Sequence, residues 1–202
     1  CPTAGNSFLG VTKALRENPR PMTGNLTQPE RREALRVLYR DTLLDDVMPF
    51  WLKHGMDREY DGIITSLDRD GSILDTDKSI WFQGRAAWTF ATLFNTVEKR
   101  REWLDAAGSC LAFLDTHGYA TDGKLFFTVT REGRPLRMRR YVFSEAFASI
   151  AHAAYAKATG DERYAEKAKR DFTTYLKHSF DKGMMQPKIE PNTRPMMGIG
   201  AL

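Results

Sequence analysis

The sequence predicts an all-α toroid in which short β-hairpins separate pairs of helices. The main observation is an internal repeat of about 60 residues. It is marked by histidines that end the helical segments and by glycines that follow them: His54, His117 and His178, and Gly62, Gly123 and Gly183. Each repeat holds one helix that is apolar almost all round and one that is amphipathic, which predicts an inner and an outer helical layer. Because such a ring must close to cover its apolar faces, we expect residues 29–202 to form about half of a toroid, its N-terminal half.

The composition excludes several classes of protein. Of the 202 residues, 42% are hydrophobic and 28% are charged, which is typical of a globular chain. The longest apolar runs are only a few residues, so we expect no membrane span. Two cysteines, Cys1 and Cys110, are too few for a disulfide framework or a thiolate metal cluster. The net charge of +4 permits an anionic partner without requiring one, and no motif indicates a metal or another cofactor.

The first part of the chain predicts an arm followed by a long helix. Residues 1–28 are rich in Pro, Gly, Asn and Thr, as arms and linkers are. Pro29 and Glu30 then begin a helix, since proline suits the first helical turn. Apolar residues continue at the helical period as far as Leu52, and the helix is expected to end at residues 53–55.

Two hairpins and four further helices are predicted along the rest of the chain. The turn sequences DRDG and EG, each between short apolar segments, are hairpin signals. The hairpins are expected over 63–67 with 72–74 and over 124–130 with 135–138. The helices are expected over 79–95, 99–117, 141–159 and 161–178, and residues 194–202 read as the start of another buried helix.

Three stretches resemble the N-acylglucosamine 2-epimerase family. WFQGRAAWTFATLFN (81–95), with PFWLKHGMDREYDGIITSLDRDGSILDTDKS before it, carries the most specific string, W-x-Q-G-R. FSEAFASIAHAAYAKATGDERYAEKA (143–168) is similar to a second family motif, and RPMMGIGAL (194–202) to the start of a third inner helix. The resemblance covers about 49–202, and it implies an (α/α)6 barrel longer than this chain.

The resemblance implies a cofactor-free sugar epimerase. Such an enzyme acts at C2 of a free aldose or an N-acylhexosamine of the N-acetylglucosamine and N-acetylmannosamine type. A base removes the C2 proton beside the aldehyde to give an enediolate, and an acid returns a proton to the opposite face. Positive charge or hydrogen-bond donors must stabilise the oxyanion that develops.

Arg85 is the expected catalytic residue, because it lies four residues after Trp81 on one helix face and can stabilise that oxyanion. A carboxylate such as Glu145, or a sugar oxygen, would satisfy its guanidinium; a structural Arg–Glu pair is the alternative. The remaining residues are expected to bind substrate, although aromatic residues at helical spacing are also typical of a core: Trp81, Gln83, Tyr141, Glu145 and Arg194.

The four histidines are expected to be structural. His54, His117 and His178 stand at equivalent helix ends, where a cation is favoured, and His152 is expected to be a packed or outer-face residue. The resemblance implies a catalytic histidine pair in the second half of the barrel, so the acid and base are not assigned here.

Other functions remain open at this point. An (α/α)6 glycoside hydrolase would need paired carboxylates, which acidic residues near the first hairpin could supply: Asp57, Asp61, Asp75 and Asp77. A non-catalytic carbohydrate-binding or protein-binding relative is a further alternative. The arginine run REGRPLRMRR (131–140) could be a polyanion patch, but a solvated hairpin paired with nearby carboxylates is favoured, and no nucleic acid is expected.

A cytoplasmic protein is expected, with a periplasmic or lipid-anchored one as the alternative if Cys1 is a processed lipoprotein start. The resemblance also implies a homodimer.

Overall fold

The computed structural model describes residues 28–138, 142–181 and 184. The chain divides into two compact units, Cys1–His54 and Gly55–Leu202. Except for Gln28, the predicted arm lies outside the described residues, as does the predicted helix start at 194–202. No helix in the described part of the chain is both long and apolar enough to cross a membrane.

The first unit contains the predicted long helix, interrupted by wider turns. α2 (Pro29–Thr42) is followed by the π-helical segment η1 (Leu43–Val47), the short α3 (Met48–Phe50) and a second π segment, η2 (Trp51–Gly55). Pro49 accounts for the first of these segments, because it has no N–H to donate to the carbonyl of Asp45, four residues earlier. The sequence analysis predicted one helix and did not anticipate the π turns.

Both predicted hairpins are present in the second unit. β1 (Ser66–Leu67) pairs antiparallel with β2 (Ile73–Asp75), and β4 (Thr128–Val129) with β5 (Pro135–Arg137). The two turns contain Gly71 and Gly133, whose φ values of 89° and 95° favour glycine.

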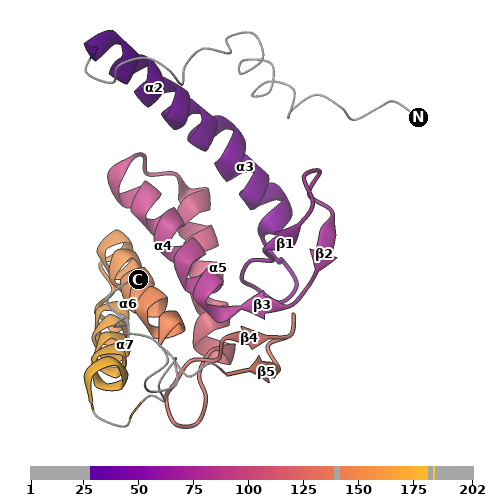
Figure 1. Ribbon diagram of the computed structural model, residues 1–202, viewed down its shortest axis with the longest axis vertical. Coiled ribbons are helices and arrows are strands. Elements are labelled where there is room, and N and C mark those ends of the chain that lie inside the picture. The colour runs from indigo at the N-terminus through magenta and orange to yellow at the C-terminus, as the bar shows by residue number, and fades with distance from the viewer. Residues whose placement is uncertain (1–27, 139–141, 182–183, 185–202) are drawn as a thin grey trace, which may run out of the picture. The chain divides into compact units, whose positions relative to one another are not determined.

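A strand that the sequence did not predict joins the two repeats. β3 (Lys78–Ser79) pairs with β4, Lys78 opposite Val129 and Ser79 opposite Thr128, so the sheet order is β3-β4-β5. β3 leads directly into the next helix (Figure 1). The second hairpin is therefore fastened to the start of the first inner helix.

Four long helices make up the rest of the unit: α4 (Ile80–Thr96), α5 (Arg101–His117), α6 (Phe143–Thr159) and α7 (Glu162–Phe180). α4 packs against both α5 and α6, and α6 packs against α7 (Figure 1). α4 and α6 are therefore the inner helices, and α5 and α7 the outer ones, as the amphipathic pattern predicts. Asp161 caps α7 by accepting a hydrogen bond from the Arg163 N–H, 3.0 Å away.

The core lies between the inner helices, α5 and the hairpins. Its central cluster of buried side chains is Ile80, Phe113, Leu114, Leu125, Val129 and Ala148. Gly84 lets α4 approach α6 closely, because a Cβ at this position would lie 2.9 Å from the main-chain carbon of Phe147.

Hydrogen bonds confirm the internal repeat for its first two copies, while Gly183, which marks the third, lies outside the described residues. Met56 bridges to Ile63 in the first repeat, and Tyr119 bridges to Leu125 in the second. The same pattern of main-chain hydrogen bonds surrounds each bridge. In the first repeat the N–H of Asp57 donates to the carbonyl of Gly62, and that of Ile64 to the carbonyl of Gly55. In the second repeat the N–H of Ala120 donates to the carbonyl of Lys124, and that of Phe126 to the carbonyl of Gly118. Ile63 and Leu125 are therefore equivalent positions, 62 residues apart (63 to 125).

Candidate functional site

One face of the inner helices remains open in the second unit. On α4 it carries Trp81, which is half-buried, Arg85, which is exposed, and Trp88, which is 39% exposed. These residues follow one another at spacings of four and three, so they share one helix face. We call this set, together with its counterparts on α6, the inner-helix face. α4 is thus an inner helix with one face that stays exposed among the described residues.

The same positions of α6 carry apolar residues. Phe143, Phe147 and Ile150 lie 62 residues after Trp81, Arg85 and Trp88. Ile150 is 41% exposed, close to the exposed fraction of Trp88. The inner-helix face is thus apolar and aromatic, with one cation, Arg85.

Aromatic contacts join the two helices beside this cation. The ring of Trp81 lies edge-on to Phe143, with centroids 5.3 Å apart, and its centroid is 5.6 Å from that of Phe147. Such pairs favour a fixed ring orientation. Trp81 therefore contributes to packing and also borders the exposed face.

Arg85 has no charged partner among the described residues, and its guanidinium makes no hydrogen bond with them. Its main-chain carbonyl accepts a bond from the Thr89 hydroxyl, as ordinary helical residues do. The expected ion pair with Glu145 is wrong, because the Glu145 carboxyl bonds elsewhere. The guanidinium is consequently available to an anion.

Gln83 lies on the other side of α4. Two residues correspond to about 200° of helical rotation, so Gln83 and Arg85 point in nearly opposite directions. Gln83 is buried; its Oε1 accepts from the N–H of Ile63 and its Nε2 donates to the carbonyl of the same residue, both at 2.8 Å. The side chain holds the loop before β1, and the expectation of a sugar contact is not supported.

Glu145, like Gln83, is buried and hydrogen-bonded to a main-chain group. It lies in the first turn of α6, with 1% of its surface exposed, and its Oε1 accepts from the N–H of Leu125 at 2.9 Å. Burial raises the pKa of Glu145 above its usual value. This position corrects the expectation that Glu145 faces the substrate. Tyr141 and Arg194, the other expected binding residues, lie outside the described residues.

His152 is packed on the outer side of α6, as predicted. Its Nδ1 lies 2.8 Å from Oδ2 of Asp171 and its Nε2 lies 3.1 Å from Oδ1 of Asp115. Burial lowers the pKa of His152, but the hydrogen bonds and charges of the two carboxylates outweigh burial and leave that pKa above its ordinary value. His152 thus joins α6 to both outer helices.

A buried charge cluster underlies the hairpins. The ammonium of Lys78 lies 2.9 Å from Oδ2 of Asp57, 2.6 Å from the Asp61 carbonyl and 3.1 Å from the Arg131 carbonyl. Arg131 also donates to both carboxylate oxygens of Asp57, at 2.8 and 3.0 Å. Burial raises the pKa of Asp57, but these bonds outweigh burial and hold that pKa well below its usual range. Asp57 is therefore a structural carboxylate and not a free acid or base.

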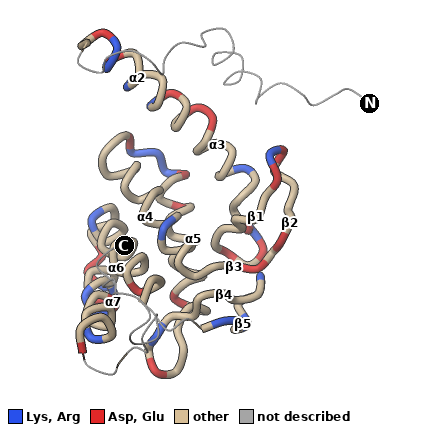
Figure 2. Tube along the Cα trace, viewed as in Figure 1, with Lys and Arg blue, Asp and Glu red and all other residues tan. Residues whose placement is uncertain are grey.

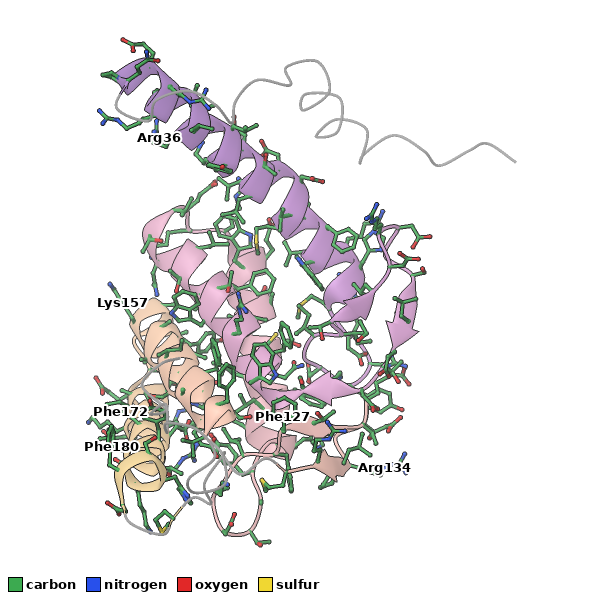
Figure 3. All side chains as sticks on the ribbon, viewed as in Figure 1. Arg36, Phe127, Arg134, Lys157, Phe172 and Phe180 are labelled. Atoms are coloured by element: carbon green, nitrogen blue, oxygen red, sulfur yellow. The ribbon has the colours of Figure 1, made fainter. Side chains whose placement is uncertain are left out.

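The beginning of the arginine run behaves as a solvated hairpin. Arg131 pairs with Asp57 and Glu59, and Arg134, on the turn between β4 and β5, pairs with Glu132 (Figure 3). Figure 2 shows both signs of charge along the hairpins. The prediction of pairing with nearby carboxylates is confirmed for Arg131 and Arg134. Within the described ranges, no three His, Cys, Asp or Glu side chains gather to hold a metal ion.

Sequence reasoning missed two features of this region. Trp88 was treated only as part of an apolar helix, although its position seven residues after Trp81 places it on the same face. Lys78 carried no signal of its own, and Asp57 was noted only as a candidate acid, because the two residues meet only through the fold.

The comparisons with known proteins agree with this organisation. The N-acylglucosamine 2-epimerase (GlcNAc 2-epimerase) family model matches residues 62–197. The N-acylglucosamine 2-epimerase of Mus musculus is 35% identical over 182 residues, which are 83% of this chain and 43% of the mouse protein. That of Homo sapiens is 36% identical over 166 residues, which are 76% of this chain and 39% of the human protein.

A solved structure, the cellobiose 2-epimerase from Spirochaeta thermophila, is 28% identical with a TM-score of 0.68. The likeness covers 80% of this chain and 40% of that one. It confirms the predicted fold class, an (α/α)6 toroid with short hairpins of which a part is present. The chain spans less than half the length of the relatives described here.

Proposed function

The chain belongs to the N-acylglucosamine 2-epimerase family, and from this premise we propose that the whole protein is an isomerase that epimerises a sugar at C2. The substrate class is a free aldose or an N-acylhexosamine. The observation that carries the proposal is Arg85, a cation exposed between two tryptophans on the inner-helix face and without an acidic partner among the described residues.

The chemistry explains why such a cation is needed. When a base removes the C2 proton of the open-chain sugar, the electron pair passes to the carbonyl oxygen and gives an enediolate. The guanidinium of Arg85 donates hydrogen bonds to that oxyanion, and because no carboxylate of the described residues pairs with it, its positive charge acts on the sugar. A proton returned to the opposite face of C2 completes the epimerisation.

Trp81 and Trp88 are proposed to border the sugar, because exposed indole faces pack well against the C–H groups of a pyranose or its open chain. Tyr141 and Arg194 are also proposed to contact the sugar, on the basis of the resemblance. The acid and base are proposed to come from the histidines that the resemblance implies in the second half of the toroid. The composition of residues 1–28 supports an arm, and the repeat count together with the resemblance supports the N-terminal half of the barrel over 29–202.

The rival enzyme class is not favoured. A glycoside hydrolase on this fold would need two available carboxylates. Of the candidates, Asp57 is fully bonded to Lys78 and Arg131, and Asp61 accepts from the Ser109 hydroxyl at 2.8 Å. The relatives named above are epimerases. A homodimer stays a proposal that rests on the resemblance. A cytoplasmic location also stays a proposal, as does the absence of a nucleic-acid partner, which rests on the hairpin context of the arginine run.

The proposal is tested with the complete protein in D2O. We would incubate it separately with N-acetylglucosamine, N-acetylmannosamine, glucose, mannose and cellobiose and follow the C2 proton by NMR. We expect exchange at C2 together with the epimer of one of these sugars. Formation of a ketose would identify an aldose–ketose isomerase instead, and a folded protein that exchanges no C2 proton in any of the sugars would contradict the proposal.

A further inference from the structure

Gln83 and Glu145 occupy the same position in consecutive repeats. They stand 62 residues apart (83 to 145), as do the residues whose N–H they accept, Ile63 and Leu125. Both side chains lie in the first turn or so of an inner helix, and both are buried. The repeat therefore presents the same main-chain group to an amide in one copy and to a carboxyl group in the other.

The main chain opposite these side chains is also equivalent. In each repeat the bonds of the bridge run through the residues flanking Ile63 or Leu125. The N–H and C=O of Ile63 consequently point toward α4, where Gln83 binds both. By the same geometry the N–H and C=O of Leu125 point toward α6 and Glu145.

The two repeats differ at the second polar atom of each side chain, which is Nε2 in Gln83 and Oε2 in Glu145. Gln83 Nε2 donates to the Ile63 carbonyl at 2.8 Å. Glu145 Oε2 corresponds chemically to that nitrogen, since Oε1 already accepts from the Leu125 N–H. Oε2 is buried and has no hydrogen-bond partner among the described residues. A carboxylate oxygen cannot donate to a carbonyl, and a buried anionic oxygen without a donor is costly. A proton on Oε2 removes both difficulties at once.

We propose that Glu145 is a neutral carboxylic acid in the folded protein at neutral pH, with its Oε2 hydroxyl donating to the main-chain carbonyl of Leu125. The acid thereby reproduces the pair of hydrogen bonds that Gln83 makes with Ile63. Glu145 is a positioning residue: it fastens the loop before β4 to the start of α6.

The surroundings agree with a neutral acid. Burial is the largest influence and raises the pKa of Glu145; hydrogen bonds from the main-chain N–H groups of Leu125 and of Glu145 itself lower that pKa but do not outweigh burial. The charged groups that act on it oppose one another, since Lys124, in the loop before β4, favours the anion and Asp171, on α7, favours the acid. A neutral Glu145 also adds no negative charge to the inner helices that hold Arg85.

The test compares the stability of the complete protein and its Glu145→Gln variant in urea, from about pH 5 to about pH 9. An acid whose pKa is raised by folding binds its proton more tightly in the folded state. Stability therefore falls as the pH rises from the unfolded pKa through the folded one. We expect Glu145→Gln to be at least as stable as the wild type at neutral pH and to lose less stability as the pH rises. Glu145→Ala should be less stable than both.

A spectroscopic measurement identifies the proton directly. The infrared difference between wild type and Glu145→Gln at neutral pH should contain the carbonyl band of a protonated carboxylic acid. A carboxylate band in its place, or a Glu145→Gln variant that is less stable than wild type by the same amount at every pH, would overturn the proposal.

Gln83→Glu keeps the proposal testable if Glu145→Gln does not fold. This substitution creates a second buried acid at the equivalent position, so it should fold at acidic pH and lose stability steeply as the pH rises. A Gln83→Glu protein with the pH dependence of the wild type would count against a neutral acid in this setting.

Discussion

The ammonium of Lys78 lies 2.9 Å from Oδ2 of Asp57, and neither side chain has any exposed surface. Two main-chain carbonyls, those of Asp61 and Arg131, accept from the same ammonium, so its three protons have acceptors. Lys78 also lies 4.1 Å from the ring centroid of Phe113. Because Lys78 stands three residues before Trp81, this cluster fixes the loop before β1 and the turn of the second hairpin to the beginning of the helix that carries Arg85.

Removing the ammonium should destabilise the protein strongly. In Lys78→Met the Asp57 carboxylate stays buried with only Arg131 as its cation, and a broken buried pair typically costs about 3–5 kcal/mol. Urea unfolding would measure the loss. Lys157→Met is the matched control, since Lys157 is exposed on α6 (Figure 3) and surface changes of this kind usually stay within about 0.5 kcal/mol. Equal losses for the two variants would contradict a structural role for Lys78.

Arg85→Ala should reduce turnover without unfolding the protein. If Arg85 stabilises the enediolate, its removal lowers kcat by about 10²–10³-fold, as for other donors to an oxyanion. The effect on KM should be smaller, because the interaction strengthens in the transition state. Arg134→Ala is the control, since Arg134 pairs with Glu132 on a hairpin turn. An Arg85→Ala enzyme that turns over near the wild-type rate would remove Arg85 from the mechanism.

His152 should make stability depend on pH. The pKa of His152 lies above its ordinary value of about 6.5 because Asp115 and Asp171 hold the imidazolium. The stabilisation is therefore complete below the ordinary pKa and is lost as the pH rises through the raised one. His152→Gln should be less stable than wild type at acidic pH, and the difference should shrink at alkaline pH. Thermal unfolding across this range would measure it, with His54→Gln as control, and a constant difference would refute a charged His152.

Gly84→Ala should separate the inner helices. A Cβ at this position meets the main-chain carbon and oxygen of Phe147 and the nitrogen of Ala148 at 2.9 to 3.0 Å, and a helix backbone cannot move aside locally. Overpacking of this kind costs about 1–3 kcal/mol.

Gly108→Ala is the control for this substitution. Gly108 lies inside α5, and its added Cβ meets only the end of the Tyr155 side chain, which can rotate. This variant should lose little stability, because alanine favours a helix more than glycine does. If Gly84→Ala is as stable as Gly108→Ala, the close approach of α4 and α6 is not required.

The sequence predicted the repeat, both hairpins and the four helices because each follows from local periodicity and turn chemistry. β3 was missed because two residues carry no periodicity, and they form a strand only by pairing with β4, fifty residues away. Lysine is rarely buried, so nothing local predicted the position of Lys78.

The candidate site shows a related difficulty. Gln83 and Arg85 belong to one short motif and were assigned to one site, yet helical geometry turns them to opposite sides of α4. The motif was recognised because its residues are close in sequence. Only the structure shows that Arg85 is exposed and that Gln83 is buried and holds a loop.

The pairing of β3 with β4 bears on how the domain comes apart. In an array of repeats, cooperativity depends on how strongly neighbours are coupled relative to the stability of each repeat alone. Here the ladder adds main-chain hydrogen bonds to the packing of α4 on α6. The two repeats it joins should therefore melt together in one transition, and not fray one after the other from an end.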